Sequence, residues 1–387
     1  MTTDSIVDWL LEEAPTLPSC RHVLQGLIDR LNGEGMTLHR AVLGIGVLHP
    51  EIMAKTYTWE RGGRYVSETE IHHGIESTDQ YLDSPFRPLN EGEPFVRHRL
   101  VGRGAEIAYP VLEEQRDAGA TDYIAIGLPR SDGQIYRSSW TTDRQGGFTD
   151  AEIERLLSLR PAIGVIAELQ SRAEMTKSVL DLYLGREAGR RVYAGDIKRG
   201  DGETIRSVLW MCDLRGFTSL SDRIPLDFLI AVLNDYFEAV TGPIHASGGE
   251  VLKFIGDAVL GIFRIDNETE IAEICERALS AAELAVANMH ILNRRRRRED
   301  KPPLDFSIAL HVGDAMYGNV GAQDRLDFTV IGPAVNLCAR LEALAGGLGE
   351  KIICSSEFAE IATAEMRSIG RHDLKNVESP MEAFVPV

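Results

Sequence analysis

Apolar residues recur along the first part of the chain in two different periods, which predict both helices and strands. From Ile6 to Leu31 they recur at helical spacing, with a stripe formed by Val23, Leu24, Leu27, Ile28 and Leu31. Runs rich in β-branched and aromatic residues follow at 41–48, 53–60, 65–71, 121–128 and 135–142. The last two runs flank a Ser131-Asp-Gly133 turn, which favours a hairpin. We therefore expect an α/β domain over residues 1–150.

A long helical pattern follows this domain. Thr149 or Asp150 suits the N-cap of a helix that continues past Pro161 toward Leu184. Its residues with a seven-residue spacing are Ile166, Ala173 and Leu180, interleaved with Leu169, Thr176 and Tyr183. This spacing fits a parallel coiled coil between two chains, and it fits equally well a helix that packs against its own domain. Residues 151–202 are thus expected to form a helical linker whose last part, 185–202, is a polar connector.

The remaining residues, 203–387, alternate between strand and helix patterns. Helical spacing of apolar residues covers 229–240 and 271–289, and runs typical of strands occur at 208–212, 251–263, 304–312 and 326–331. A further helix is expected to begin at Gly332-Pro333, with proline in a permissive first-turn position. These patterns predict a mixed α/β fold in which helices cover a sheet.

Composition narrows the class of protein. The chain has 387 residues, of which 44% are hydrophobic, and a formal net charge of -18. Such a charge repels phosphates and argues against nucleic-acid or anionic-membrane binding. We expect a cytoplasmic protein with no membrane span, because the chain has neither a signal peptide nor a run of about 18 apolar residues. The five cysteines have no paired spacing, which argues against disulfides and a zinc site.

One dense basic run interrupts this acidic composition. Arg294 to Arg298 are consecutive arginines, which we interpret as part of a solvated loop between Asn293 and Pro302. Recruitment of a partner or of anionic lipid is the alternative interpretation.

Two aspartates stand where apolar runs are interrupted. Asp213 ends the run Val208-Leu-Trp-Met-Cys212, and Asp257 follows Gly256 inside 251–263. Glycine in the first of two central turn positions suits a tight hairpin, which would put Asp257 at its tip. Two carboxylates on rigid strands suit magnesium, which fills its other positions with water and substrate phosphates. Each aspartate taken alone is equally well explained as an ordinary turn residue.

Four segments in this order resemble the catalytic domain of class III nucleotidyl cyclases. They are Asp213-Leu-Arg-Gly-Phe-Thr218, Phe254-Ile-Gly-Asp-Ala-Val259, Asp327-Phe-Thr-Val-Ile-Gly332 and Val335-Asn-Leu-Cys-Ala-Arg340. The resemblance covers 203–387 and implies a ferredoxin-like α/β (α+β) fold. The strand, turn, strand and Gly146-Gly-Phe-Thr-Asp150 pattern at the end of 1–150 resembles a GAF-type sensory domain. It implies a GAF-like N-terminal domain with a small-molecule effector that the sequence does not identify.

The cyclase resemblance implies a metal and phosphate site. Two divalent cations per active site, Mg²⁺ or Mn²⁺, would be held by Asp213 and Asp257 together with Leu214. Backbone N–H groups of the following loop would cradle the triphosphate, at Leu214, Gly216, Phe217 and Thr218.

The same resemblance implies residues for the base, the ribose and the reaction. Lys253 and Thr329 take the purine-recognition positions, where a lysine can donate to adenine N1 and a threonine can accept from the exocyclic amine. Asn336 would orient the ribose, Arg340 would stabilise charge as pyrophosphate leaves, and Lys375 would hold the terminal phosphates. Two positions depart from the family's commoner residues: Pro333 replaces Asp, and Asn376 replaces Gly beside Lys375.

The function that we expect is that of an adenylate cyclase, which converts ATP to 3′,5′-cyclic AMP and pyrophosphate. One hairpin turn separates Lys253 from Asp257, yet the resemblance assigns them to opposite ends of the nucleotide. They should therefore serve different sites of a homodimer, formed through the catalytic domains and the linker helix. Three alternatives stay open: a guanylate cyclase, an inactive nucleotide-binding module, and a front half that only dimerises.

Overall fold

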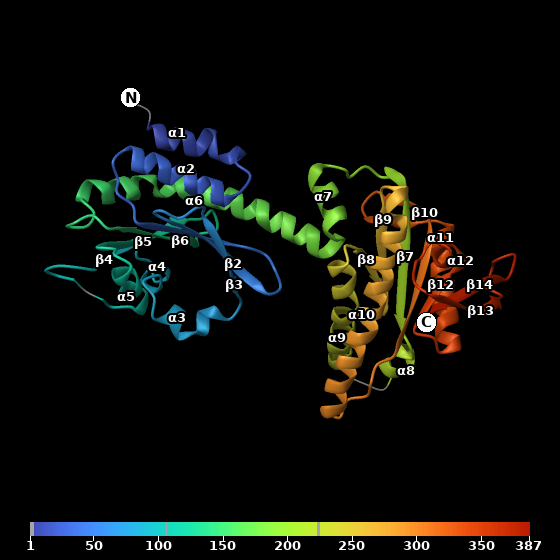
Figure 1. Cartoon of the computed structure of the whole chain (residues 1–387). Coiled ribbons are helices and arrows are strands. Elements are labelled where there is room, and N and C mark those ends of the chain that lie inside the picture. Colours follow the sequence, from blue (N-terminus) through green and yellow to red (C-terminus); the bar gives the residue numbers. More distant parts are fainter. Residues whose placement is uncertain (1–3, 106, 223–224) are drawn as a thin grey trace. The chain divides into compact units, whose positions relative to one another are not determined.

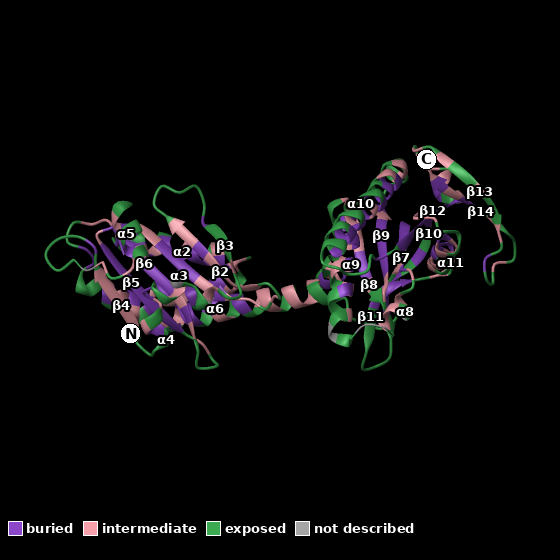
Figure 2. Ribbon diagram, turned by 90° about the horizontal axis from the view of Figure 1, so that it is seen from below, coloured by how far each residue is buried: buried purple, intermediate pink, exposed green. Residues whose placement is uncertain are grey.

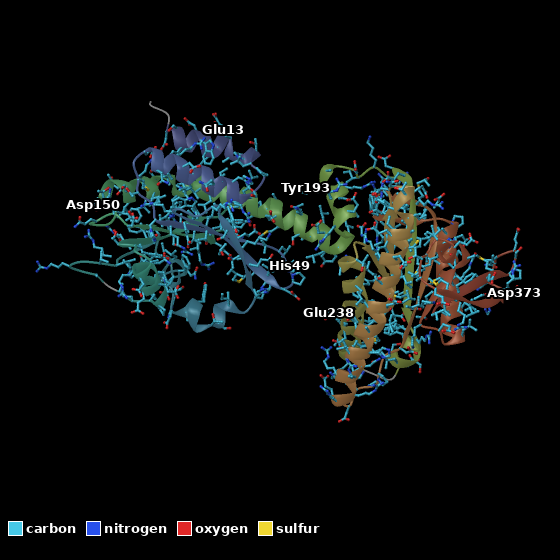
Figure 3. The ribbon with its side chains drawn as sticks, viewed as in Figure 1. Glu13, His49, Asp150, Tyr193, Glu238 and Asp373 are labelled. Carbon is cyan, nitrogen blue, oxygen red and sulfur yellow. The ribbon has the colours of Figure 1, made fainter. Side chains whose placement is uncertain are left out.

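The chain divides into two compact units, Met1–Val179 and Leu180–Val387, each with its own sheet (Figure 1). The computed structural model describes residues 4–105, 107–222 and 225–387. Burial is concentrated between each sheet and its helices (Figure 2). Charged side chains such as Glu13, Asp150, Glu238 and Asp373 are exposed (Figure 3). Among the described residues, no helix combines the length and the apolar character that crossing a bilayer requires.

In the described part of the N-terminal unit, a six-stranded sheet has the order β3-β2-β1-β6-β5-β4, and its neighbouring strands are antiparallel. The strands are β1 (Arg40–Gly46), β2 (Ile52–Glu60), β3 (Ser67–His72), β4 (Phe95–Arg99), β5 (Asp122–Pro129) and β6 (Ile135–Thr142). The predicted hairpin is confirmed, because β5 pairs with β6 around the Ser131-Asp-Gly133 turn.

Helices lie on both faces of this sheet (Figure 1). On one face are α1 (Ser5–Glu12), α2 (Cys20–Gly33) and α6 (Asp150–Leu184), whose apolar residues form one core with alternate residues of β1, β5 and β6. On the other are α3 (Asp79–Leu82), α4 (Arg87–Asn90) and α5 (Pro110–Asp117). The single helix predicted from Ile6 to Leu31 is wrong in one respect: it is two helices, separated by a segment that contains Pro15 and Pro18.

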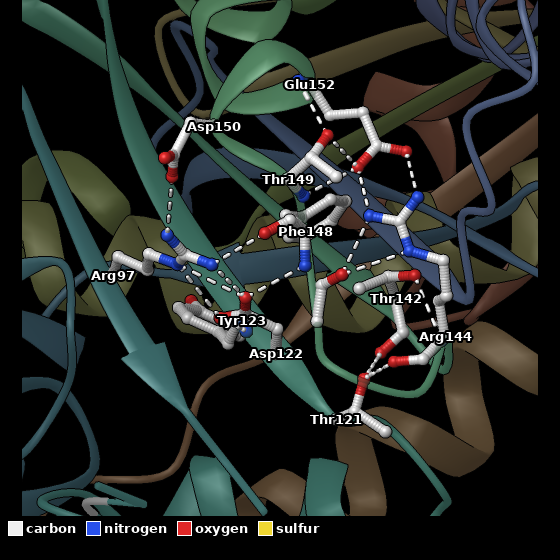
Figure 4. A network of polar contacts seen from close by, with 11 residues as sticks. Arg97, Thr121, Asp122, Tyr123, Thr142, Arg144, Phe148, Thr149, Asp150 and Glu152 are labelled. Atoms are coloured by element: carbon white, nitrogen blue, oxygen red, sulfur yellow. Dashed lines mark hydrogen bonds and ion pairs between the residues drawn. The ribbon is translucent and has the colours of Figure 1, made fainter.

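Two polar groups fix the start of α6 (Figure 4). Asp122 of β5 is fully buried, pairs with Arg97 of β4 at 2.6 Å and accepts a hydrogen bond from the backbone N–H of Phe148. Thr149 and Glu152 form a capping box, in which each side chain accepts from the backbone N–H of the other residue. The predicted N-cap at Thr149 is confirmed, and it ties the helix to the sheet.

The burial of residues along α6 does not follow the seven-residue spacing expected for a simple coiled coil. Ile166 is only 2% exposed and packs into the core of the N-terminal unit. This agrees with the alternative prediction, in which the helix packs against its own domain. By contrast, Leu169 and Tyr183 are 44% and 83% exposed. Val165 is exposed as well, so the outward stripe runs through 165, 169, 176 and 183.

A helix occupies part of the expected polar connector. Residues Arg186–Ala194 form α7, which buries Ala188 against the C-terminal sheet. Arg191 of α7 lies over the rings of Tyr317 and Phe328, at 5.3 and 6.0 Å from their centroids. The connector prediction is therefore wrong for this stretch, because small and long amphipathic residues give it a buried face.

In the described part of the C-terminal unit, an eight-stranded sheet has the order β13-β14-β12-β10-β7-β9-β8, and β11 pairs with β10. The strands are β7 (Gly202–Leu214), β8 (Glu250–Ile255), β9 (Ala258–Ile265), β10 (Phe306–Gly321), β11 (Leu326–Ile331), β12 (Ile352–Ser355), β13 (Met366–His372) and β14 (Met381–Pro386). The central order β10-β7-β9-β8, with a helix after β7 and another after β9, is the split βαβ arrangement of ferredoxin-like folds. The mixed α/β prediction is confirmed.

The helices of this unit pack on opposite faces of its sheet. Helices α9 (Leu226–Ala246) and α10 (Ile271–Arg298) cover one face, and α11 (Pro333–Leu348) covers the other. Two short helices, α8 (Phe217–Ser221) and α12 (Ser356–Ala359), complete the unit. Successive side chains of β7 point to opposite faces of the sheet. Trp210 packs under α9 and α10, while Leu209 and Met211 pack under α11.

The run of five arginines ends α10, so the loop prediction for it is wrong. Arg296 is 3% exposed and donates to the carbonyl of Pro302, and Arg295 pairs with Asp235 at 2.7 Å. Cations are favourable at a helix C-terminus, which explains why the helix extends through them.

Candidate functional site

Asp213 and Asp257 are brought together by β7 and the β8–β9 hairpin. Asp213 is the penultimate residue of β7, and Asp257 lies in the two-residue turn between Ile255 and Ala258, which pair across the hairpin. Gly256 has a φ of +66°, and Asp257 is not among the described residues with positive φ. The hairpin prediction is confirmed, because glycine occupies the turn position that needs the left-handed conformation.

The electrostatics of this pair suit a cation. Burial raises the pKa of Asp213 to about 7, and a hydrogen bond and repulsion from Asp257 add to the effect. A third carboxylate, Glu342 of α11, acts in the same direction. A divalent cation between the two aspartates would remove this repulsion, and two carboxylates are the protein ligand set that Mg²⁺ commonly uses. The residues therefore fit the metal, although the described part of the chain holds no cluster of three or more acidic, His or Cys side chains arranged around an ion.

The loop after Asp213 lines a hollow. Leu214 donates its N–H to Asp213 at 3.1 Å, and Gly216 has a φ of +70° just before α8 begins at Phe217. A pocket of ≈ 200 Å³ is lined by the residues 214–217, Ser219, Leu220, Pro303 and Leu304. The side chain of Thr218 lies outside what the structure describes. The predicted phosphate-binding loop thus follows Asp213 directly and lines this pocket.

Lys253 and Thr329 lie on neighbouring strands. The Lys253 ammonium on β8 is 2.5 Å from the carboxylate of Asp327 on β11. Thr329, two residues further along β11, is 4% exposed, and its hydroxyl has no hydrogen-bond partner among the described residues. A buried hydroxyl without a partner is uncommon, because it loses its hydrogen bonds to water. Sequence reasoning missed Asp327, although its i, i+2 spacing to Thr329 places both on one face of the strand.

Asn336 and Arg340 lie one turn apart on α11. Asn336 is exposed, whereas Arg340 is half-buried and donates to the carbonyl of Asn376 at 3.4 Å. Asn376 has a φ of +59°, a conformation that glycine adopts most easily and asparagine tolerates. This explains how asparagine replaces the commoner glycine there. Lys375 is exposed in the same loop, so the loop and Arg340 lie close together.

The predicted site residues thus form separate groups within one chain. Asp213 and Asp257 make contact with each other, Lys253 pairs with β11, and Arg340 contacts the loop that carries Lys375. No described contact joins Lys253 to the aspartate pair, although only one turn separates them in the sequence.

Comparison with known proteins agrees with this architecture. Residues 205–385 match the family model of the adenylate and guanylate cyclase catalytic domain. An uncharacterized protein of Mycobacterium tuberculosis is 32% identical over 227 residues, which are 58% of this chain and 40% of that protein. An adenylate cyclase of Anabaena cylindrica is 33% identical over 162 residues, which are 41% of this chain and 31% of that protein.

One solved structure resembles more of the chain. A bacterial light-regulated adenylyl cyclase has a TM-score of 0.50 and 21% identity, covering 71% of this chain and 87% of that one. At this identity the likeness concerns the fold. The chain spans less than half the length of the curated relatives described above. The four motifs, the strand order and the family match together identify the C-terminal unit as carrying a class III adenylate/guanylate cyclase catalytic domain.

Proposed function

We propose that this domain is an adenylate cyclase, which forms 3′,5′-cyclic AMP and pyrophosphate from ATP. The observation that carries the choice of ATP is the buried hydroxyl of Thr329, which has no partner among the described residues, on the strand that also holds Lys253 through Asp327. A buried hydroxyl without a described partner keeps its hydrogen-bonding capacity, which a nucleotide that enters the site would use. The adenylate cyclase of Anabaena cylindrica, which is similar to part of this chain, supports the same class of reaction.

The chemistry of the purine edge favours adenine at these residues. Adenine presents an acceptor at N1 and a donor at its exocyclic amine, which match the Lys253 ammonium and the Thr329 hydroxyl. Guanine presents a donor and an acceptor in the reverse order, so the Lys253 ammonium would face a donor. A mismatch in a site of this kind leaves buried polar groups unpaired, at a cost of about 1–3 kcal/mol each.

The remaining residues would act on the ribose and the phosphates. Asn336 would hold the ribose, and the Arg340 guanidinium, one turn away, would stabilise the negative charge that develops as pyrophosphate leaves. Lys375 would bind the terminal phosphates. Asp213 and Asp257 would hold two divalent cations, Mg²⁺ or Mn²⁺, which when bound supply charge neutralisation and lower the pKa of the attacking 3′-hydroxyl.

We infer that two chains build each site. The separate groups of residues described above would be completed by a second copy related by a two-fold axis. Apolar side chains next to Lys253 support a contact there: Phe254 and Ile255 are 52% and 51% exposed. The ring of Phe254 packs against that of Phe237 on α9, with the ring centroids 4.2 Å apart. This contact extends the apolar surface onto α9.

We further propose that the N-terminal unit is a GAF-like regulatory domain that acts through α6. Its six-stranded antiparallel sheet with helices on both faces supports this, as do two buried polar atoms without described partners, Ser84 Oγ and Gln115 Oε1. Such atoms are candidates for binding a small effector molecule. The exposed stripe of α6 would pair with that of the second chain.

The direct test is nucleotide turnover by the purified full chain. With Mg²⁺ or Mn²⁺, we expect cyclic AMP and pyrophosphate from ATP at a kcat/KM at least tenfold above that for GTP. Comparable production of cyclic GMP would contradict the choice of ATP. Absence of both products, with nucleotide still bound, would favour an inactive nucleotide-binding module.

A further inference from the structure

Arg215 lies two residues after Asp213, yet its guanidinium is held by other groups. Its Nε lies 3.4 Å from the Ser307 hydroxyl, and its Nη1 lies 3.4 Å from the Asp305 carboxylate. The remaining nitrogen donates to the backbone carbonyls of Ala345, at the end of α11, and of Glu350. Arg215 therefore joins the loop after β7 to strand β10 and to the C-terminal end of α11.

Ser307 and Glu342 form further contacts next to Arg215. Ser307 is fully buried, is the cross-strand partner of Asp213, and donates its hydroxyl to Glu342 at 2.7 Å. Glu342 is 8% exposed on the inner face of α11. Burial raises the pKa of Glu342, while the hydrogen bond from Ser307 and the charge of Arg215 act in the opposite direction. We call Arg215, Ser307 and Glu342 the Arg215 cluster.

The position of this cluster has a physical consequence for the aspartate pair. A guanidinium is a strong partner for two adjacent carboxylates, and Arg215 is close enough in sequence to compete with a metal for Asp213 and Asp257. Four acceptors hold the guanidinium instead: the Ser307 hydroxyl, the Asp305 carboxylate and the backbone carbonyls of Ala345 and Glu350. The same bonds fix the backbone that follows Asp213, which limits the orientations of its carboxylate.

We propose that the Arg215 cluster positions the metal-binding loop and keeps the Asp213–Asp257 pair free for divalent cations. This inference rests on the proposed function, because it concerns the metal that the cyclase reaction would use. Ser307 and Glu342 act through Arg215 and Asp213 and are positioning residues. No role for these three residues follows from the motif roles given above.

The first test measures metal binding without nucleotide. Mn²⁺ is titrated into the full chain and free Mn²⁺ is followed by electron paramagnetic resonance, with Asp213→Asn defining the signal that belongs to the pair. We expect Ser307→Ala and Glu342→Gln to weaken this binding by about 10- to 100-fold, the usual effect of losing a group that orients a metal ligand. Thermal midpoints are measured for every variant.

A matched carboxylate serves as the control. Glu276 of α10 accepts hydrogen bonds from the backbone N–H groups of Thr363 and Ala364, and it lies outside the groups described for the site. Glu276→Gln should leave Mn²⁺ binding unchanged. Unaltered Mn²⁺ binding in folded Ser307→Ala and Glu342→Gln chains would overturn the inference. If Glu342→Gln does not fold, Ser307→Ala decides, since it removes a single oxygen atom.

A second test asks which half of a shared site the cluster serves. In a mixed dimer of Asp257→Ala and Asn336→Ala chains, the intact site takes its aspartates from the Asn336→Ala chain. Glu342→Gln is added to one chain or to the other. We expect the Mn²⁺ concentration for half-maximal activity to rise about tenfold or more only when the chain that donates the aspartates carries it.

The outcomes separate this inference from the proposed function. An equal effect of Glu342→Gln in both chains would mean general destabilisation and would overturn the positioning role. A wild-type chain that makes no cyclic nucleotide would contradict the proposed function, while the Mn²⁺ titration would still decide the inference on its own.

Discussion

The Lys253 ammonium and the Asp327 carboxylate lie 2.5 Å apart, so that the lysine proposed to recognise the base is oriented in the chain without nucleotide. Asp327 is 59% exposed at its side chain, so the pair contributes at most about 1 kcal/mol in water. We expect Asp327→Ala to lower kcat/KM for ATP about three- to tenfold. Asp324→Ala, an exposed aspartate in the same hairpin, should change nothing in the same steady-state assay. An equal loss in both variants would mean that charge near the hairpin, and not the pair, matters.

Thr329→Val should separate stability from activity. Valine keeps the shape of threonine and removes a buried hydroxyl that has no described partner, so the thermal midpoint should stay or rise. The kcat/KM for ATP should fall by about 10- to 100-fold, because the adenine amine would lose its acceptor. Calorimetry and turnover on one preparation check both directions. A lower midpoint with unchanged activity would mean that the hydroxyl serves the fold.

Mixing two inactive chains tests the shared site. Asp257→Ala and Asn336→Ala dimers should each be nearly inactive. A mixed dimer has one site with both lesions and one with neither, so it should recover about half of the wild-type activity if the sites are independent. Tagged chains and sequential affinity purification confirm subunit exchange. No recovery in verified mixed dimers would argue against two-chain sites or would show that the sites are strictly coupled.

The phase of α6 should matter if it transmits a signal from the N-terminal unit. One alanine inserted between Thr176 and Lys177 rotates one end of the helix by about 100° relative to the other. We expect specific activity to change several-fold. A seven-residue helical insertion at the same place restores the phase to within about 20° and is the matched control. Equal activity in both variants and the wild type would indicate that the front half is structural.

The N-terminal unit should lose the stabilising contact between Asp4 and Arg155 at low pH. A hydrogen bond from Arg155 of α6 lowers the pKa of Asp4, the N-cap of α1, to about 2 from its usual value of 3.8. A carboxylate with a lowered folded pKa stabilises the fold above its unfolded pKa, and this stabilisation is lost as pH falls from about 4 to about 2. Fluorescence of the buried Trp9 can follow the change in α1. The Asp4→Asn variant should lack this part of the pH dependence.

Local patterns predicted much of the fold because burial has a period. The β5–β6 hairpin, the capping box at Thr149 and the Gly256-Asp257 turn all follow from residues that are adjacent in sequence. Motifs also located the aspartates that the structure brings together. Adjacent residues are enough for such features because their geometry is set by local backbone preference.

Features that depend on distant partners were missed. A stripe on α6 shows which residues are apolar, but only the assembled N-terminal core decides that Ile166 points inward. The arginines that end α10 look like a loop until Asp235 and the Pro302 carbonyl are placed beside them. The contacts of Lys253 with Asp327 and of Ser307 with Glu342 join residues that are 74 and 35 positions apart. Sequence spacing contains no signal for the second contact, and for the first it indicates only that Asp327 shares a strand face with Thr329.

The site residues form separate groups within one chain. Under the proposed two-chain arrangement, activity therefore depends on the concentration of the protein. A chain that carries only half of each site works only after it meets another copy, so the rate at low concentration would grow with the square of the amount of protein. Doubling expression would then raise output fourfold below the dissociation constant of the dimer and only twofold above it. The abundance of the protein would itself set a threshold, before any effector is bound.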